Sequence, residues 1–235
     1  MKNFRTLLLI FFAFTFPAPA AINAQDKEES LTSIDTGLDI YSSYVWRGSK
    51  FGSGPAFQPW VEGGIGALAI GAWGSVNSST DESFEMDLYI SYGFDFGLSI
   101  AVTDYYFGGD YTITHLNHYI EPSLVFEIGD LSLTAAYMFL AATEADEEAG
   151  TEATDYGEEG DMYFEAGYAF GALEVAIGAG DGQYVSEDDD FMICNLTVGT
   201  SKEIEITDRF FLPLSGAVTF NPSTGGFFIY AGISF

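Results

Sequence analysis

Apolar and polar residues alternate along most of the chain, so that every second side chain is apolar. In the stretch "FEMDLYISYGF", Phe84, Met86 and Leu88 open an apolar face, while Glu85 and Asp87 open a polar one. A period of two is typical of a β-strand whose two faces meet different surroundings, whereas an amphipathic helix repeats every 3.6 residues or so. The chain is therefore predicted to be all-β.

Twelve segments carry this alternation and are separated by breaks rich in Gly, Asp, Asn and Ser. The expected strands span residues 34–46, 57–63, 67–75, 84–94, 98–106, 118–128, 131–140, 162–170, 173–179, 191–201, 209–220 and 226–235. The stretch "KEIEITD" leaves the end of the tenth strand undefined. About twelve strands are predicted, with ten or fourteen as alternatives.

The connections between these strands alternate in length. Those after odd-numbered strands are mostly longer and more polar, as in "RGSKFGSGP" and "GDGQYVSEDDD", and those after even-numbered strands are mostly tight turns. This asymmetry is typical of a transmembrane antiparallel up-and-down β-barrel, which has an even strand number. The alternative is a secreted β-sandwich, but sandwich strands average about 5–6 residues. Most of the expected strands are nearer the roughly 9–11 residues that span a bilayer.

Four residues fit this pattern poorly. Pro59, Pro122 and Pro213 fall inside expected strands, although proline cannot donate a hydrogen bond to a ladder. We expect bulges or positions near loops to accommodate them. Asp104 shares the lipid-facing parity of Val102, so either a bulge precedes it or it lies above the apolar band.

The N-terminus predicts export. Lys2 and Arg5 precede an apolar run over residues 6–16 and then small residues, which is typical of a secretory signal peptide covering residues 1–24. Residues 25–33 are then expected to form a periplasmic segment and residues 34–235 the barrel.

The C-terminus predicts insertion into an outer membrane. The last expected strand alternates to its final residue, and its lipid-facing set includes Phe227, Ile233 and Phe235. This ending resembles the C-terminal signal of bacterial outer-membrane proteins, which implies recognition by the barrel-assembly machinery.

Acidic residues far outnumber basic ones, with 35 Asp and Glu against 7 Lys and Arg and a net charge of −28. Nucleic acid is excluded as a partner because binding phosphates needs basic groups. Strand parity predicts that nine carboxylates face the lumen, with two arginines at strand ends: Asp35, Asp39, Glu62, Glu85, Asp87, Glu121, Glu127, Glu165 and Glu174, with Arg47 and Arg209. Buried charges are costly unless solvated or paired, so we expect either a hydrated interior or pairing of these carboxylates with the two arginines.

Arg47 is expected to cross the upper lumen and to narrow the path there. Its predicted partner is Asp39 or a carboxylate of a neighbouring strand.

The remaining candidate residues give weaker predictions of function. His115 and His118 lie near the expected barrel mouth and leave an enzyme as a minor alternative, but no motif fixes a catalytic geometry around them. Cys194 is expected to be a buried or lipid-facing apolar residue rather than a nucleophile. The acidic loop over residues 143–161 is expected to be solvated, with Ca²⁺ or Mg²⁺ held against lipopolysaccharide phosphates as the functional alternative. Neither a cofactor nor a protein metal site is expected.

The motifs "SSYVWRG", "PAFQPWVEGG", "AIGAWGS" and "VTDYYF" resemble the N-terminal half of the TorF-type porins. These are bacterial outer-membrane β-barrels, and the "VWRG" and "TDYYF" variants are similar to members from the Bacteroidetes. The resemblance covers roughly residues 35–107. It implies a barrel fold and an outer-membrane location in a Gram-negative bacterium, and it implies no catalytic residues.

The expected function is therefore a narrow, cation-preferring porin or channel that passes small hydrophilic solutes. The expected partners are outer-membrane lipid, lipopolysaccharide and the assembly machinery. A non-conducting structural or adhesin barrel is the main alternative, since inward charges also brace barrels.

Overall fold

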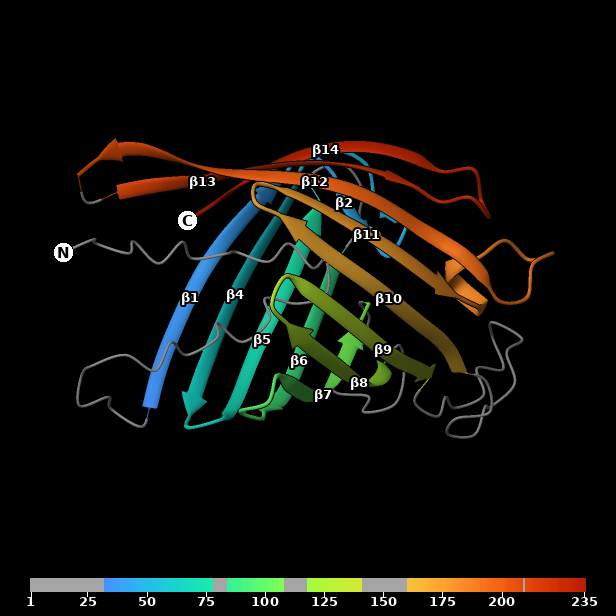
Figure 1. Ribbon diagram of the computed structural model, residues 1–235, viewed down its shortest axis with the longest axis horizontal. Coiled ribbons are helices and arrows are strands. Elements are labelled where there is room, and N and C mark those ends of the chain that lie inside the picture. Colours follow the sequence, from blue (N-terminus) through green and yellow to red (C-terminus); the bar gives the residue numbers. More distant parts are fainter. Residues whose placement is uncertain (1–31, 78–83, 108–117, 141–159, 209) are drawn as a thin grey trace, which may run out of the picture.

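The computed structural model describes residues 32–77, 84–107, 118–140, 160–208 and 210–235, which form a closed antiparallel β-barrel (Figure 1). The described residues supply twelve barrel strands: β1 (Thr32–Tyr41), β4 (Ala56–Ile65), β5 (Leu68–Asn77), β6 (Phe84–Gly93), β7 (Leu98–Tyr106), β8 (His118–Ile128), β9 (Leu131–Leu140), β10 (Gly160–Phe170), β11 (Leu173–Gly180), β12 (Met192–Thr207), β13 (Phe210–Phe220) and β14 (Phe227–Ser234). The predicted fold class and strand number are confirmed. No helix in the described ranges is long and apolar enough to cross a membrane.

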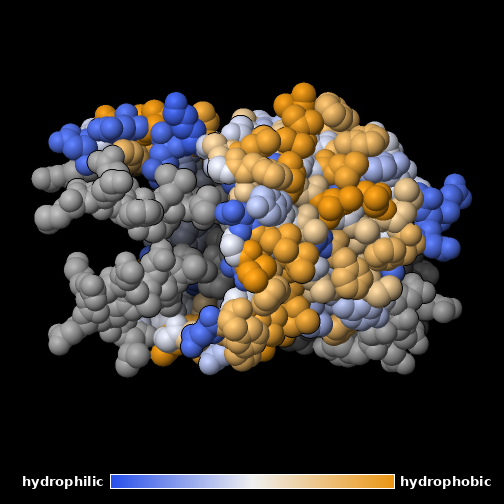
Figure 2. Space-filling view, in the orientation of Figure 1, coloured by the Kyte–Doolittle hydropathy of each residue, from blue (hydrophilic) through white to orange (hydrophobic). Residues whose placement is uncertain are grey.

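The two faces of the barrel wall have opposite polarity. Large apolar side chains such as Ile70, Ile90 and Ile229 are exposed on the outside, whereas Asp87 and Thr103 are buried inside. Figure 2 shows apolar residues covering the middle of the visible face, with hydrophilic residues toward its ends. A sandwich would bury its apolar faces against each other, so the sandwich alternative is wrong.

The barrel closes along a short seam between its first and last strands. β1 and β14 pair from Asp39–Ser234 to Tyr41–Gly232. Leu38 and Phe235 add two backbone hydrogen bonds, of 3.1 and 3.0 Å. Phe235 is exposed on the outward face, the parity that the sequence predicts.

Each of the three prolines lies at a position where the strand is unpaired on one side. The β4–β5 ladder skips Gln58 and Pro59, and the β8–β9 ladder skips Glu121 and Pro122, in both cases without a change of register. The expected bulges are therefore wrong at these two positions. Pro213 lies near the start of β13, just before its first pair with β14, as expected for a position near a loop.

The first predicted strand, over residues 34–46, is wrong at its end. β1 stops at Tyr41, and a separate hairpin follows, formed by β2 (Tyr44–Trp46) and β3 (Ser49–Phe51). Its turn residues Arg47 and Gly48 have φ angles of +48° and +83°. Positive φ at both turn positions is the requirement of a two-residue type I′ hairpin. The stretch "RGSKFGSGP" is thus only partly a loop.

We call the barrel end that holds the β1–β4 connection the loop end, and the end that holds the tight turns the turn end. The described residues between β11 and β12 include a short 3₁₀ helix, η1 (Gly182–Tyr184), at the loop end. At the turn end, β12 runs on to Thr207 and pairs with β13 from Leu196 onward, with an irregularity between Glu205 and Thr207. This places the boundary in "KEIEITD" that the sequence leaves undefined.

Candidate functional site: the lumen and its plug hairpin

The hairpin Tyr44–Phe51, here called the plug hairpin, packs inside the lumen at the loop end. Tyr44 donates a hydrogen bond to Glu85 on β6 at 3.2 Å and packs against Trp73 on β5. Trp46 packs against Tyr105 on β7, with ring centroids 5.7 Å apart. These partners lie on the second to fourth strands from β1 around the barrel, so the hairpin folds into the lumen and away from β1.

Gly48 places the tip of the plug hairpin against β12. A Cβ atom at this position would lie 1.9 Å from the carbonyl oxygen of Cys194 and 3.2 Å from Nδ2 of Asn221. Only glycine therefore fits here, both for its positive φ and for its contact with the wall. Cys194 itself is buried, in agreement with the expectation that it is no exposed nucleophile.

Arg47 is buried at the centre of this packing, with 3% of its surface exposed. Its Nη1 and Nη2 donate to the two carboxylate oxygens of Glu121 on β8, at 2.5 and 2.9 Å. Nη1 also donates to the hydroxyl of Tyr184 at 2.7 Å. The predicted partner of Arg47 is wrong. It binds Glu121 rather than Asp39 or a carboxylate on a strand next to β1, because the hairpin carries it away from β1.

Aromatic rings surround the guanidinium group. Its Cζ atom lies 4.4 Å from the ring centroids of Trp46 and Tyr163 and 5.5 Å from that of Tyr184. Cation–π contacts are strongest where water is excluded, and a bidentate arginine–carboxylate pair adds directional bonds. The plug hairpin is therefore held by one charge pair inside an aromatic shell.

The connection over residues 180–190 contributes to this shell, although its sequence predicts a polar outer loop. Tyr184 is buried and packs on Trp46 and Tyr163. Asn221 donates to its backbone carbonyl at 3.1 Å. Further out, Asp189 accepts hydrogen bonds from the hydroxyls of Ser186 and Ser223, which lower the pKa of its carboxyl group.

The predicted inward carboxylates fall into two groups. Glu85, Asp87 and Glu121 are buried around the plug hairpin. The other predicted acids face the lumen elsewhere along the strands: Asp35 beside Glu62, Asp39 beside Ser234, Glu127 beside Ser132, Glu165 on β10 and Glu174 on β11. Arg209, residues 1–31, His115 and most of the acidic loop lie outside the described residues.

The loop end also carries a polar pair on the outside of the barrel. His118 Nδ1 lies 2.8 Å from an Asp104 carboxylate oxygen, and both residues have outward parity on β8 and β7. The β6–β7 ladder has no register shift, so of the two alternatives for Asp104 the bulge is wrong. Parity predicts the outward side of Asp104, but not its bond to His118, which joins two neighbouring strands.

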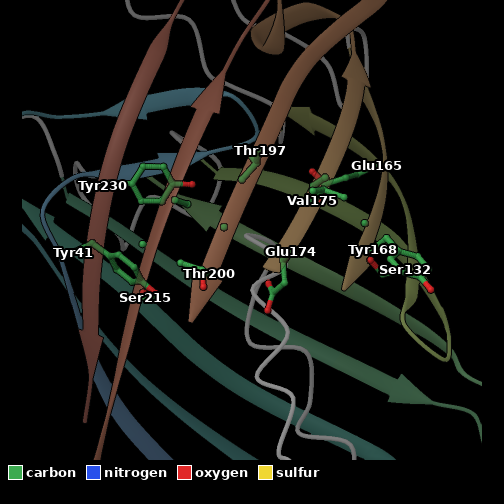
Figure 3. Close-up of a pocket in the computed structure, with 15 residues that line it drawn as sticks. Tyr41, Ser132, Glu165, Tyr168, Glu174, Val175, Thr197, Thr200, Ser215 and Tyr230 are labelled. Atoms are coloured by element: carbon green, nitrogen blue, oxygen red, sulfur yellow. The ribbon is translucent and has the colours of Figure 1, made fainter. Parts of the chain in front are cut away.

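The turn half of the lumen is less filled. A cavity that opens to solvent lies there between β1 and strands β9 to β14. Tyr41 and Tyr230 line one side of it, and Glu165 and Glu174 line the other (Figure 3). Its wall includes the inward residues Gly167 and Gly199, whose missing side chains leave room there.

No family model matches the chain, and no curated protein matches it. Solved structures that resemble it include engineered variants of the porin of Rhodopseudomonas blastica. One triple mutant is 14% identical, covers 77% of this chain and has a TM-score of 0.39. Another mutant of that porin has a TM-score of 0.40 at the same identity and coverage. The chain spans 55% of the length of these porins, and the fold class here rests on the chain's own strand pairing.

Proposed function

We propose that this protein is a narrow, cation-preferring channel of the Gram-negative outer membrane that passes small hydrophilic solutes. The observation that carries the proposal is the charge of the inward faces. Nine carboxylates have inward parity on the described strands, and the buried cation in the described lumen, Arg47, is already paired with Glu121. Acidic rings favour cations in such pores, and their field extends over about 8 Å at physiological salt.

In this proposal the plug hairpin determines the width of the conducting path. It fills the loop half of the lumen, so conduction depends on a path beside the hairpin or on its displacement. Releasing Arg47 from Glu121 would loosen the hairpin without removing any strand from the barrel. Arg47→Ala is therefore expected to raise conductance while the remaining carboxylates preserve cation preference.

Planar-bilayer recordings of the refolded full chain test this directly. We expect cation preference, measured as the reversal potential in a KCl gradient, in both the wild type and Arg47→Ala, with higher conductance in the variant. Lys202→Ala is a matched control, because this substitution also removes one positive charge, but from the outward face of β12. Anion preference in the wild type would refute the charge argument, and unchanged conductance in Arg47→Ala would remove Arg47 from the constriction.

The second candidate function is a non-conducting structural or adhesin barrel. The burial of Arg47 and Glu121 favours it, because a fully desolvated pair gives no water path at that level. Absence of current from the wild type and from a variant whose residues 44–51 are replaced by a short Gly-Ser turn would support this candidate. An enzyme is less favoured, since His118 and Asp104 face outward rather than into the lumen.

The proposed orientation places the loop end outside the cell and both termini in the periplasm. It is supported by the polar composition of the long connections, which would meet lipopolysaccharide. A tag inserted near Gly150 is expected to be reachable on intact cells. A tag reachable only from the periplasm would overturn the orientation and leave the barrel assignment intact.

A further inference from the structure

The cavity in the turn half of the lumen has the chemistry of a binding site. It lies beneath the plug hairpin, so a solute that enters from the turn end meets it before the narrowest level. Pockets for small ligands combine a mostly apolar wall with a few directed polar groups. The side chains of Tyr41, Tyr230, Glu165, Glu174, Thr197 and Ser215 supply that mixture here (Figure 3).

The polar groups of the lining are mainly acceptors. Two carboxylates and several hydroxyls face the cavity, and its lining contains no Lys, Arg, His, Asn or Gln among the described residues. An anionic solute would therefore meet negative charge with only hydroxyl donors to compensate. A solute with ammonium groups would meet charge of the opposite sign.

Glu165 is held in place by neutral donors. The hydroxyl of Tyr163 and Nδ2 of Asn195 both donate to its Oε2, the latter at 2.8 Å. Neither bond uses Oε1, and neither donor carries a charge that would neutralise the carboxylate. The side chain is thus oriented in advance, with negative charge left for a ligand.

Two aromatic rings complete the site. Tyr230 on β14 and Tyr41 on β1 lie on the side of the cavity opposite the carboxylates (Figure 3). The hydroxyl of Tyr230 is bonded to Thr219 at 3.1 Å, which fixes the ring. Ring faces attract ammonium groups and also cover their alkyl chains.

We propose that this cavity binds small organic amines, meaning alkylammonium ions with one or two charged groups. Glu165 and Glu174 would accept hydrogen bonds from the ammonium groups, and the two tyrosine rings would pack on the alkyl chain. The inference builds on the proposed cation-preferring channel, and it names the class of solute that the lumen retains.

Equilibrium binding to the refolded full chain in detergent tests the site without any need for current. Three four-carbon probes of similar length separate charge from shape: putrescine, 1,4-butanediol and succinate. Putrescine is expected to bind, 1,4-butanediol to bind at least about tenfold more weakly, and succinate not to bind, because a hydrogen bond to a charged group contributes more than a neutral one. Equal affinity for putrescine and 1,4-butanediol would overturn the proposal, as would binding of succinate.

Paired variants locate the site. Glu165→Gln is expected to weaken putrescine binding by about tenfold. Glu127→Gln, which removes an inward carboxylate outside the lining, should change it by less than about twofold. Tyr230→Phe keeps the ring but loses the hydrogen bond to Thr219, so it should lose less affinity than Tyr230→Leu, which removes the ring and should bind several times more weakly. Equal losses in Glu165→Gln and Glu127→Gln would show diffuse attraction to a negative lumen and would reject the site.

The two proposals fail separately in these measurements. Cation-selective current without putrescine binding would reject the amine site and leave the channel. Putrescine binding without current in any variant would reject the channel and leave the site.

Discussion

The two halves of the lumen solve the problem of a polar interior in opposite ways. In the loop half, the chain fills the space with its own plug hairpin, and the buried acids there pack around Arg47 and its aromatic shell. In the turn half, the inward glycines Gly167 and Gly199 leave room for a cavity that Glu165 and Glu174 line. The same alternating strands therefore serve as a packed core at one end and as a more open wall at the other. What differs is how far the inward carboxylates are removed from solvent, since Glu121 is buried against Arg47 whereas Glu165 and Glu174 line an open cavity.

The largest expected effect is the loss of stability when the buried charge pair in the loop half is broken. Glu121→Ala should lower the free energy of unfolding by about 3–5 kcal/mol, because it leaves Arg47 buried without a counter-charge. The double variant Arg47→Met/Glu121→Leu should recover much of that loss, since replacing both partners by apolar groups removes the unpaired charge. Urea unfolding in detergent, followed by tryptophan fluorescence, measures both.

Glu127→Gln is the matched control in the turn half. Its carboxylate does not contact the plug hairpin, and a change of less than about 0.5 kcal/mol is expected, as for most exposed substitutions. A loss equal to that of Glu121→Ala would show that the two halves do not differ in this way.

The second prediction concerns the backbone of the plug hairpin. Gly48→Ala is expected to be clearly more destabilising than Gly129→Ala. Both glycines have positive φ, which costs a non-glycine residue about 1–2 kcal/mol, but a Cβ at Gly48 would meet the Cys194 carbonyl, while nothing lies within 4 Å of one at Gly129. Equal unfolding midpoints for the two variants would contradict the close contact between the hairpin tip and β12.

The seam gives a third, smaller contrast. Phe235→Asp should reduce the yield of inserted, heat-modifiable barrel, because it puts a charge on the outward face near the membrane boundary, where such charges cost up to about 1 kcal/mol. Ser234→Asn, on the inward side of the same seam, should have little effect. The two yields are compared by electrophoresis without boiling, and equal yields would contradict the outward role of Phe235.

The smallest effect is expected at the outer surface. Hydrogen bonds from Ser186 and Ser223 lower the pKa of Asp189 below its usual value of 3.8. Because the pKa of this carboxyl group is lower in the folded than in the unfolded state, its ionised form stabilises the folded protein at pH values above the unfolded pKa. This stabilisation is lost as the pH falls through the folded pKa. Cleavage of this connection by pepsin should therefore become easier as the pH drops from 4 toward 2. In Asp189→Asn this added sensitivity to acid should be absent, and an identical pH dependence in both proteins would contradict the assignment.

Most of the wall can be predicted from the sequence, whereas the plug hairpin cannot. The period of two is a local property, so the parity of Asp87 or Glu165 can be read from a few neighbouring residues. The partners of the plug hairpin lie far away in sequence, at separations of 74 positions from Arg47 to Glu121 and 137 positions from Arg47 to Tyr184. Parity shows that an acid points inward, but not which inward acid a folded-back hairpin reaches. One signal for the turn is Gly48, because glycine tolerates the positive φ that a tight hairpin turn requires.

The outward pair of Asp104 and His118 has a consequence for the lipid around the barrel. Both side chains have lipid-facing parity on β7 and β8, and Asp104 lies opposite Leu88 of β6. Farther toward the loop end on β6, Phe84 has the same outward parity and is exposed. The apolar surface therefore ends at a lower level on β7 and β8 than on β6. A bilayer that covers Phe84 would have to thin beside the polar pair or bury it, at a cost that grows with each ångström of mismatch. The barrel would therefore meet the lipid along an uneven edge rather than a flat ring.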